Sequence, residues 1–85
     1  MTINKSASWV KINNETMIEI SNKSTCIVFD EIGSEIWESL LITRSLEDTI
    51  HNLTTKYARN NSERDEIAKD IRAVFGTLVE NEVCY

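Results

Sequence analysis

The side chains that most often carry out catalysis are few and scattered in this chain. Its one histidine, His51, has no charged neighbour in sequence, and its two cysteines, Cys26 and Cys84, are far apart. A general base needs an orienting partner, and a metal site needs several ligands at short spacing. A glycine-rich phosphate loop and a G-x-S-x-G elbow are both absent. We therefore expect no catalytic residue, no metal site and no cofactor.

The thiols and the N-terminus indicate the chemical setting. Cys26 and Cys84 form no Cys-x-x-Cys pair, and residues 1–8 are polar, without the apolar stretch of a signal peptide. These features predict a cytosolic (cytoplasmic) protein with two free thiols, because that compartment keeps thiols reduced. A disulfide in a small secreted domain is the alternative.

Length and charge limit the size of the fold and the kind of partner. The chain has 85 residues, with 14 acidic and 9 basic side chains and a net charge of −5. We expect a single domain over residues 1–85, with an ordered core over about 8–83. The acidic balance argues against a nucleic-acid partner, which needs a basic surface. The longest apolar runs, 26–29 and 40–42, are far shorter than the roughly 20 residues of a membrane span.

The first third of the chain contains three short runs with the composition of strands. Trp9 to Asn13 and Thr16 to Ile20 alternate with a period of two, and Thr25 to Phe29 is rich in β-branched and aromatic residues. Polar clusters at 13–15 and 21–24 separate the runs, as turn residues do. This pattern predicts a three-stranded antiparallel meander.

The rest of the chain has helical periodicity in three segments, each opened by a capping signal. Asp30 precedes the first segment, and Ser45 with Asp48 opens the second. Ser62 with Asp65 opens the third, which runs to about residue 80. The expected apolar stripes are Ile32, Ile36, Trp37, Leu40 and Leu41 in the first segment, Leu46, Ile50, Leu53 and Tyr57 in the second, and Ile67, Ile71, Val74, Phe75 and Leu78 in the third.

Three strands followed by three helices indicate an α+β fold with a winged helix-turn-helix-like arrangement. An outer strand of such a sheet keeps an unpaired edge, which is usually protected by charge or proline. The run Thr25 to Phe29 has neither. It is either a core strand or an edge to which a peptide strand can be added. Asp70, at the border of the third apolar stripe, either faces a groove beside the helix or is a surface carboxylate.

Several segments together resemble the PqqD-like family of small precursor-peptide recognition domains. Residues 29–40, FDEIGSEIWESL, are similar to its pattern of a strand end followed by Asn/Asp-x-x-Gly/Ala-x-x-Ile-Trp-x-Leu. Residues 45–57 are similar to its second helix, and residues 70–83 to its third helix and end. The likeness covers about residues 9–83. The chain departs from the family pattern at Asn81-Glu82, where a glycine is common, and Asn81 is the residue expected to adopt the left-handed conformation. The tail after it is also short.

The resemblance implies that a leader peptide is added as a strand beside the third strand, against the third helix. Carried over by position, the docking residues would be Thr25, Cys26, Ile27, Val28 and Phe29 on the strand and Asp70, Ile71, Val74 and Leu78 on the helix. Asp70 and Val74 are the expected direct contacts, since Ile71 and Leu78 are expected to lie mostly in the core. Backbone hydrogen bonds on an open edge would supply affinity, and side-chain pockets would set the register.

The resemblance implies a non-catalytic adaptor, or peptide chaperone. Such a protein would be a stand-alone recognition element in the biosynthesis of ribosomally made, modified peptides. Its partners would be a precursor leader peptide and a separately encoded modifying enzyme or leader peptidase, either a cysteine-protease-like peptidase or a radical SAM enzyme. Lasso peptides are slightly favoured over radical-enzyme products, and the quinone cofactor pathway also uses such domains. The alternatives are a winged-helix DNA-binding regulator, which the acidic charge disfavours, and a purely structural subunit.

Overall fold

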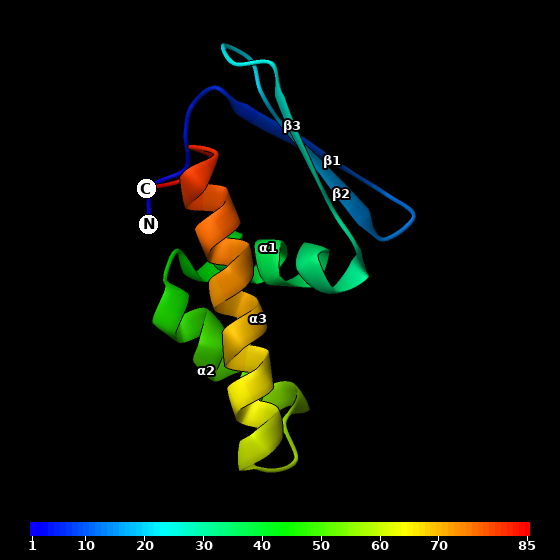
Figure 1. Cartoon of the computed structure of the whole chain (residues 1–85), viewed down its shortest axis with the longest axis vertical. Coiled ribbons are helices and arrows are strands. Elements are labelled where there is room, and N and C mark those ends of the chain that lie inside the picture. Colours follow the sequence, from blue (N-terminus) through cyan, green and yellow to red (C-terminus); the bar gives the residue numbers. More distant parts are fainter.

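The computed structural model describes residues 1–85 and contains three strands followed by three helices (Figure 1). The strands are β1 (Ala7–Ile12), β2 (Glu15–Ile20) and β3 (Thr25–Phe29), and the helices are α1 (Glu31–Thr43), α2 (Leu46–Tyr57) and α3 (Asn61–Glu80). The predicted α+β fold of an antiparallel sheet followed by three helices is therefore confirmed. None of the helices is long and apolar enough to cross a membrane.

The sheet has the order β1-β2-β3, and both neighbouring pairs are antiparallel. Ile18 of β2 lies opposite Trp9 on one side and Ile27 on the other. The first hairpin turns through Asn13 and Asn14, whose φ angles are 51° and 68°. Asparagine tolerates this left-handed region, which a two-residue hairpin turn needs at both positions. β2 is thus the central strand, and β1 and β3 are both edges.

The inward face of the sheet rests on α1 and contributes to the core. The inward residues of β2, Thr16, Ile18 and Ile20, are buried, and the alternating residues between them are exposed. On α1, Trp37 is buried, and the ring of Trp9 meets it edge to face with centroids 5.2 Å apart. Such edge-to-face pairs are a favoured arrangement of aromatic rings. The core is completed by Ile36, Leu40, Leu53, Ile71, Leu78, Val83 and Cys84.

Side chains cap the N-terminus of every helix. Asp30 Oδ1 accepts a hydrogen bond of 2.8 Å from the Gly33 N–H, as predicted. Ser45 Oγ accepts one of 3.2 Å from the Asp48 N–H, which is the predicted contact. The predicted cap of the third helix is wrong, because Asn60 Oδ1 accepts the bond, 2.9 Å from the Glu63 N–H. α3 therefore begins at Asn61, ahead of the predicted cap Ser62.

The two ends of the chain lie side by side, at the upper left of Figure 1. Ile3 pairs with Cys84 in an antiparallel bridge, and the backbone N–H of Asn4 donates to the Val83 carbonyl at 2.8 Å. Val83 and Cys84 are buried. The apolar tail therefore belongs to the core, and the N-terminal segment holds it there.

Candidate functional site

The edge of β3 is open and carries no charge. β3 pairs with β2 on one side only. Alternate residues of an antiparallel strand point their backbone N–H and C=O groups to opposite sides. Some of these groups in β3 therefore face away from β2. The other edge, β1, includes Lys11, which forms an ion pair of 2.9 Å with Glu38 of α1. Charge on an edge disfavours the addition of another strand, which leaves β3 as the better acceptor.

The side chains of β3 alternate between two faces. Thr25, Ile27 and Phe29 are half-buried and face the helices, whereas Cys26 and Val28 are exposed on the outer face. Only the first three can contribute side chains to a peptide site between the sheet and α3. The predicted contribution of Cys26 and Val28 is then limited to their backbone groups and to cross-strand contacts on the outer face.

The predicted helix residues share one face of α3 but differ in accessibility. Asp70 is exposed and Val74 is half-buried, whereas Ile71 and Leu78 are completely buried in the core. Positions four and eight residues apart lie on one side of a helix. Asp70 and Val74 are therefore the members of the predicted helix set that a ligand can reach best.

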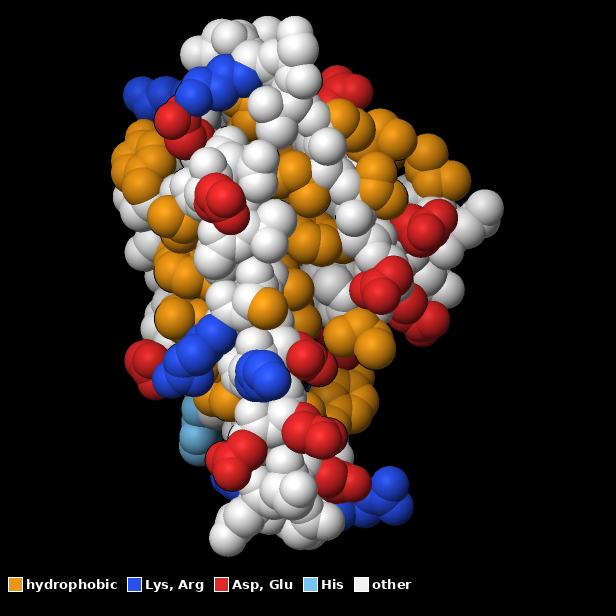
Figure 2. All heavy atoms as spheres, in the orientation of Figure 1, with side chains coloured by type: hydrophobic (Ala, Val, Ile, Leu, Met, Phe, Trp, Pro, Cys, Tyr) orange, Lys and Arg blue, Asp and Glu red, His pale blue; other side chains and the backbone are white.

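β3 and α3 are held in relation to each other by α1. α1 packs against both β3 and α3, and these two elements make no comparable direct contact with each other. In Figure 1, β3 descends to the start of α1, and α3 runs in front of that helix. Figure 2 shows hydrophobic side chains on the surface between α3 and the sheet. We call this region the β3–α3 face, made of Thr25, Ile27, Phe29, Asp70 and Val74.

A cavity of about 370 Å³ lies between α1, α2 and α3, next to the start of α1. It includes Asp70 and Ile71 of the predicted set, but neither Val74, Leu78 nor any residue of β3. Its other apolar walls are Ile32, Ile36, Leu53, Tyr57 and Ile67, and its other carboxylates are Glu31 and Glu35. None of the predicted site features includes this cavity.

Six of the cavity residues belong to the predicted apolar stripes, and two of these six are not packed in the core. Ile32 is 65% exposed and Tyr57 is 48% exposed. Both lie at the end of a stripe, Ile32 in the first turn of α1 and Tyr57 in the last turn of α2. At these ends the apolar stripe extends beyond the packed core and lines the cavity. Apolar residues at the open ends of two consecutive stripes are the signal that could have indicated it.

The rim of the cavity is acidic. Glu31, Glu35 and Asp70 take part in no ion pair. Glu35 Oε1 accepts a hydrogen bond of 2.5 Å from the Tyr57 hydroxyl. Lys56 Nζ lies 5.0 Å from the centre of the Tyr57 ring, which is a favourable cation–π distance. The pKa of Lys56 is raised by the Tyr57 side chain, first through hydrogen bonding and then through charge, and next by the charge of Glu35.

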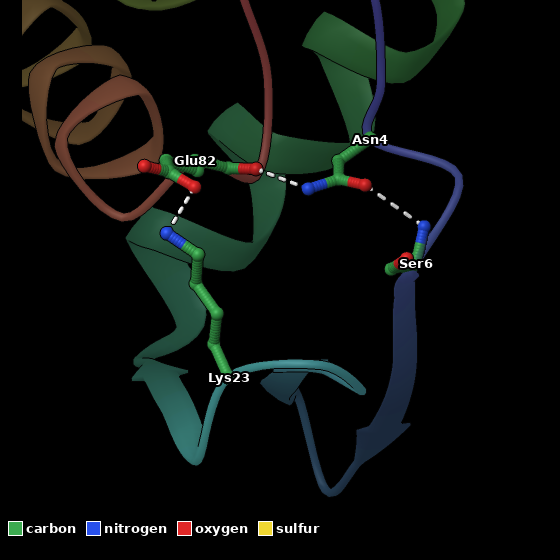
Figure 3. Close-up of polar contacts among 4 residues, drawn as sticks. All are labelled: Asn4, Ser6, Lys23 and Glu82. Carbon is green, nitrogen blue, oxygen red and sulfur yellow. Dashed lines mark hydrogen bonds and ion pairs between the residues drawn. The ribbon is translucent and has the colours of Figure 1, made fainter.

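Polar contacts tie the β2–β3 turn to the end of α3 (Figure 3). The ammonium of Lys23 pairs with the carboxylate of Glu82. Asn4 Nδ2 donates to the Glu82 carbonyl at 2.8 Å, and Asn4 Oδ1 accepts from the Ser6 N–H at 2.9 Å. The ion pair connects the turn before β3 with the end of α3, and the Asn4 bonds connect that same end of α3 with the segment before β1.

The left-handed residue after α3 is Glu82, with φ of 62°, and not Asn81 as expected. The Val83 N–H donates to the Leu78 carbonyl at 2.8 Å and the Glu82 N–H to the Val79 carbonyl at 3.0 Å. This is the Schellman arrangement, in which the residue after the cap is left-handed and usually glycine. Asn81 is the cap itself, so the expectation was displaced by one residue.

The cysteines and the histidine occupy contrasting surroundings. Both thiols are free, with Cys26 exposed and Cys84 buried. Burial raises the pKa of the Cys84 thiol, and the positive charge of the N-terminal amine opposes this shift. His51 is exposed on α2, as expected for a surface residue. No group of three or more histidine, cysteine or acidic side chains is placed to hold a metal ion.

Comparison with known proteins places the chain in a family. No curated protein matches it. The solved structure of TbiB1 in complex with the TbiA(beta) leader peptide is similar in fold, with a TM-score of 0.80 and 22% sequence identity over 98% of this chain and 93% of that one. The model of the family described as coenzyme PQQ synthesis protein D (PqqD) matches residues 8–83. This match spans nearly the whole sequence, and the chain therefore belongs to the PqqD family.

Proposed function

We propose that this protein is a non-catalytic adaptor that binds the leader segment of a ribosomally made precursor peptide. The leader is added as a strand to β3, against α3, and is presented to a separately encoded modifying enzyme or leader peptidase. The observation that carries the proposal is the open, uncharged edge of β3 beside the accessible residues Asp70 and Val74. Membership of the PqqD family and the likeness to TbiB1, which was solved with a leader peptide, support it.

Strand addition suits a domain of this size. Each backbone hydrogen bond contributes only about 0.5–1.5 kcal/mol net, so several along β3 are needed for useful affinity. These bonds do not depend on the peptide's side chains. Selectivity comes from inward-facing residues, where Ile27 and Phe29 meet one face of the added strand and Val74 bounds it from the helix side.

The proposed partners follow from the same assignment. A recognition domain that binds a precursor without modifying it must pass that peptide to a protein that does. We propose a cysteine-protease-like leader peptidase or a radical SAM enzyme, with a lasso peptide pathway favoured, and we place this step in the cytoplasm where the precursor is synthesised. The structural likeness to TbiB1 motivates a search for such an enzyme and a short precursor among neighbouring genes.

Isothermal titration calorimetry of the full chain with the leader peptide from the neighbouring precursor gene tests the binding step. We expect a dissociation constant in the micromolar range or tighter, and no binding of a scrambled leader. Absence of binding at roughly tens of micromolar would overturn the proposal.

A pair of substitutions on α3 tests the docking face. Val74→Asp places a charge on the β3–α3 face and should weaken leader binding by about tenfold or more. Val79→Asp is the matched control, because residue 79 is exposed and lies about 140° away around the helix. Equal effects of the two substitutions would contradict docking against this face of α3.

A further inference from the structure

The cavity beside the start of α1 is not explained by strand addition alone. It is open to the surface, and its volume of about 370 Å³ lies within the range of about 300–1,000 Å³ that is usual for ligand pockets. Ile32 and Tyr57 leave 65% and 48% of their surfaces exposed there. Apolar surface of this kind is favourable to cover, and the cavity is large enough for one bulky side chain.

The cavity is lined by residues that directly follow the proposed docking edge in the chain. Ile32 lies three residues after Phe29, the last residue of β3. Asp70 belongs both to the cavity rim and to the β3–α3 face. An extended peptide advances about 3.3 Å per residue, so a peptide leaving the end of β3 reaches the cavity within a few residues. The two termini lie together beside the C-terminal end of α3 (Figure 1), whereas the cavity lies at the start of α1.

The charge around the cavity selects the chemistry of its occupant. Glu31, Glu35 and Asp70 form no ion pair, and no lysine or arginine lines the cavity. Lys56 lies outside the lining, against the Tyr57 ring. Figure 2 shows acidic side chains gathered near the start of α1 and along the lower part of α3. Unpaired carboxylates around an apolar cavity attract a cation and repel an acidic peptide.

We infer that this cavity is a selectivity pocket that takes one large apolar side chain of the bound peptide and favours a lysine or arginine beside it. The inference rests on the proposed function, since the peptide is the one held on β3. The apolar side chain covers Ile32 and Tyr57, and the neighbouring cation lies among Glu31, Glu35 and Asp70. The pocket thereby extends recognition beyond the residues that are paired with β3.

The charge part of the inference is tested by fluorescence anisotropy with the full chain and a labelled leader peptide. The double variant E31Q/D70N should bind the leader about threefold to tenfold more weakly at low salt, with a smaller loss of affinity on adding salt. The control D65N/E66Q also removes two carboxylates, both on α3 and neither lining the cavity, and it should bind normally. Equal weakening by both double variants would overturn the inference, because the effect would then reflect overall charge.

The peptide is varied in the same assay. Each leader residue is replaced in turn by alanine, and each lysine or arginine by glutamine. We expect substitution at one apolar position and at an adjacent basic position to cause the largest losses of affinity. The loss caused by substituting the basic residue should disappear when the protein is E31Q/D70N. Ile32→Ser should weaken binding about tenfold, whereas Ile42→Ser, at an 83% exposed position near the other end of α1, should not.

The outcomes separate the two proposals. Suppose that Val74→Asp weakens leader binding as expected, but the leader has no dominant apolar–basic pair or Ile32→Ser leaves its affinity unchanged. That result overturns the pocket proposal and leaves strand addition in place. A leader that does not bind the unmodified protein overturns both, since the pocket is assigned to the peptide on β3.

Discussion

Phe29, the last residue of β3, lies directly against the backbone of Gly33 in the first turn of α1. A Cβ built on residue 33 would be 2.9 Å from both Cβ and Cδ1 of Phe29. Gly33 does not have positive φ, so glycine is required here for close approach and not for its backbone conformation. This contact fixes the angle at which α1 leaves the sheet, and with it the position of the cavity relative to the β3 edge.

The first prediction concerns the two glycines of the chain. Gly33→Ala should lower the free energy of unfolding by about 1–3 kcal/mol, because Phe29 or α1 must shift to admit the methyl group. Gly76→Ala is the matched control within α3, where the added Cβ meets no atom within 4 Å. It should raise stability by up to about 1 kcal/mol through helix propensity. Urea denaturation measures both, and an unchanged Gly33→Ala would contradict the close contact.

The second prediction concerns the left-handed residue after α3. Glu82→Gly and Glu82→Ala both remove the ion pair with Lys23, but only glycine relieves the left-handed backbone. Glu82→Gly should therefore be more stable than Glu82→Ala by about 1 kcal/mol. Thermal unfolding of the two variants provides the comparison. Equal stability would mean that residue 82 of the variants is not held in this conformation.

Local signals explain which parts of the fold the sequence could predict. The caps at Asp30 and Ser45 were correct because a capping side chain bonds to a backbone N–H three residues away, so all the information lies within one turn. The third cap was misplaced because Asn60 and Ser62 both fit the same pattern. The choice between them depends on where the chain leaves α2, and Ala58 already has extended backbone there.

The site was less predictable because it depends on contacts between elements. Strand composition left open whether β3 is a core strand or an edge, and the sheet order β1-β2-β3 shows that it is an edge. The exposure of Ile32 did not follow, because periodicity shows which side of a helix is apolar and not where its packed neighbours end. Likewise, Glu82 adopts the left-handed conformation where Lys23 and Asn4, remote in sequence, bind its carboxylate and its carbonyl.

The third prediction concerns the buried thiol. Burial raises the pKa of Cys84 above its ordinary value of 9.0, so the unfolded chain loses this proton at a lower pH than the folded one. The contribution of this thiol to the free energy of unfolding is fully present below the pKa of the unfolded state. It is lost as the pH rises from that pKa towards the higher pKa of the folded state. The unfolding free energy should fall as the pH rises above about 8, by at most about 1.4 kcal/mol per pH unit from this group. Cys84→Ala should show a shallower fall in the same denaturation series, and identical slopes would contradict the assignment.

The fourth prediction uses the exposed thiol as a reporter of peptide binding. Cys26 should react readily with iodoacetamide, whereas Cys84 should stay protected until the protein unfolds. An added strand on β3 flanks Cys26, so bound leader should slow its alkylation several-fold. The matched control is Ser8→Cys in a Cys26→Ser background, because Ser8 and Cys26 both lie opposite Glu19, on the two different edges. Mass spectrometry follows the labelling, and protection at residue 8 in place of residue 26 would assign the peptide to β1.

The fifth prediction tests strand addition through the peptide backbone. A set of leader peptides, each methylated at one backbone nitrogen, should lose affinity for the full chain at every second position over the segment that pairs with β3. The period of two arises because alternate amides of a strand point toward the neighbouring strand and the others point away. Alanine substitution of the same residues serves as the side-chain control. A helical ligand docked on the β3–α3 face would show no alternation, since methylation at every interior position disrupts a helix, and that result would exclude pairing with β3.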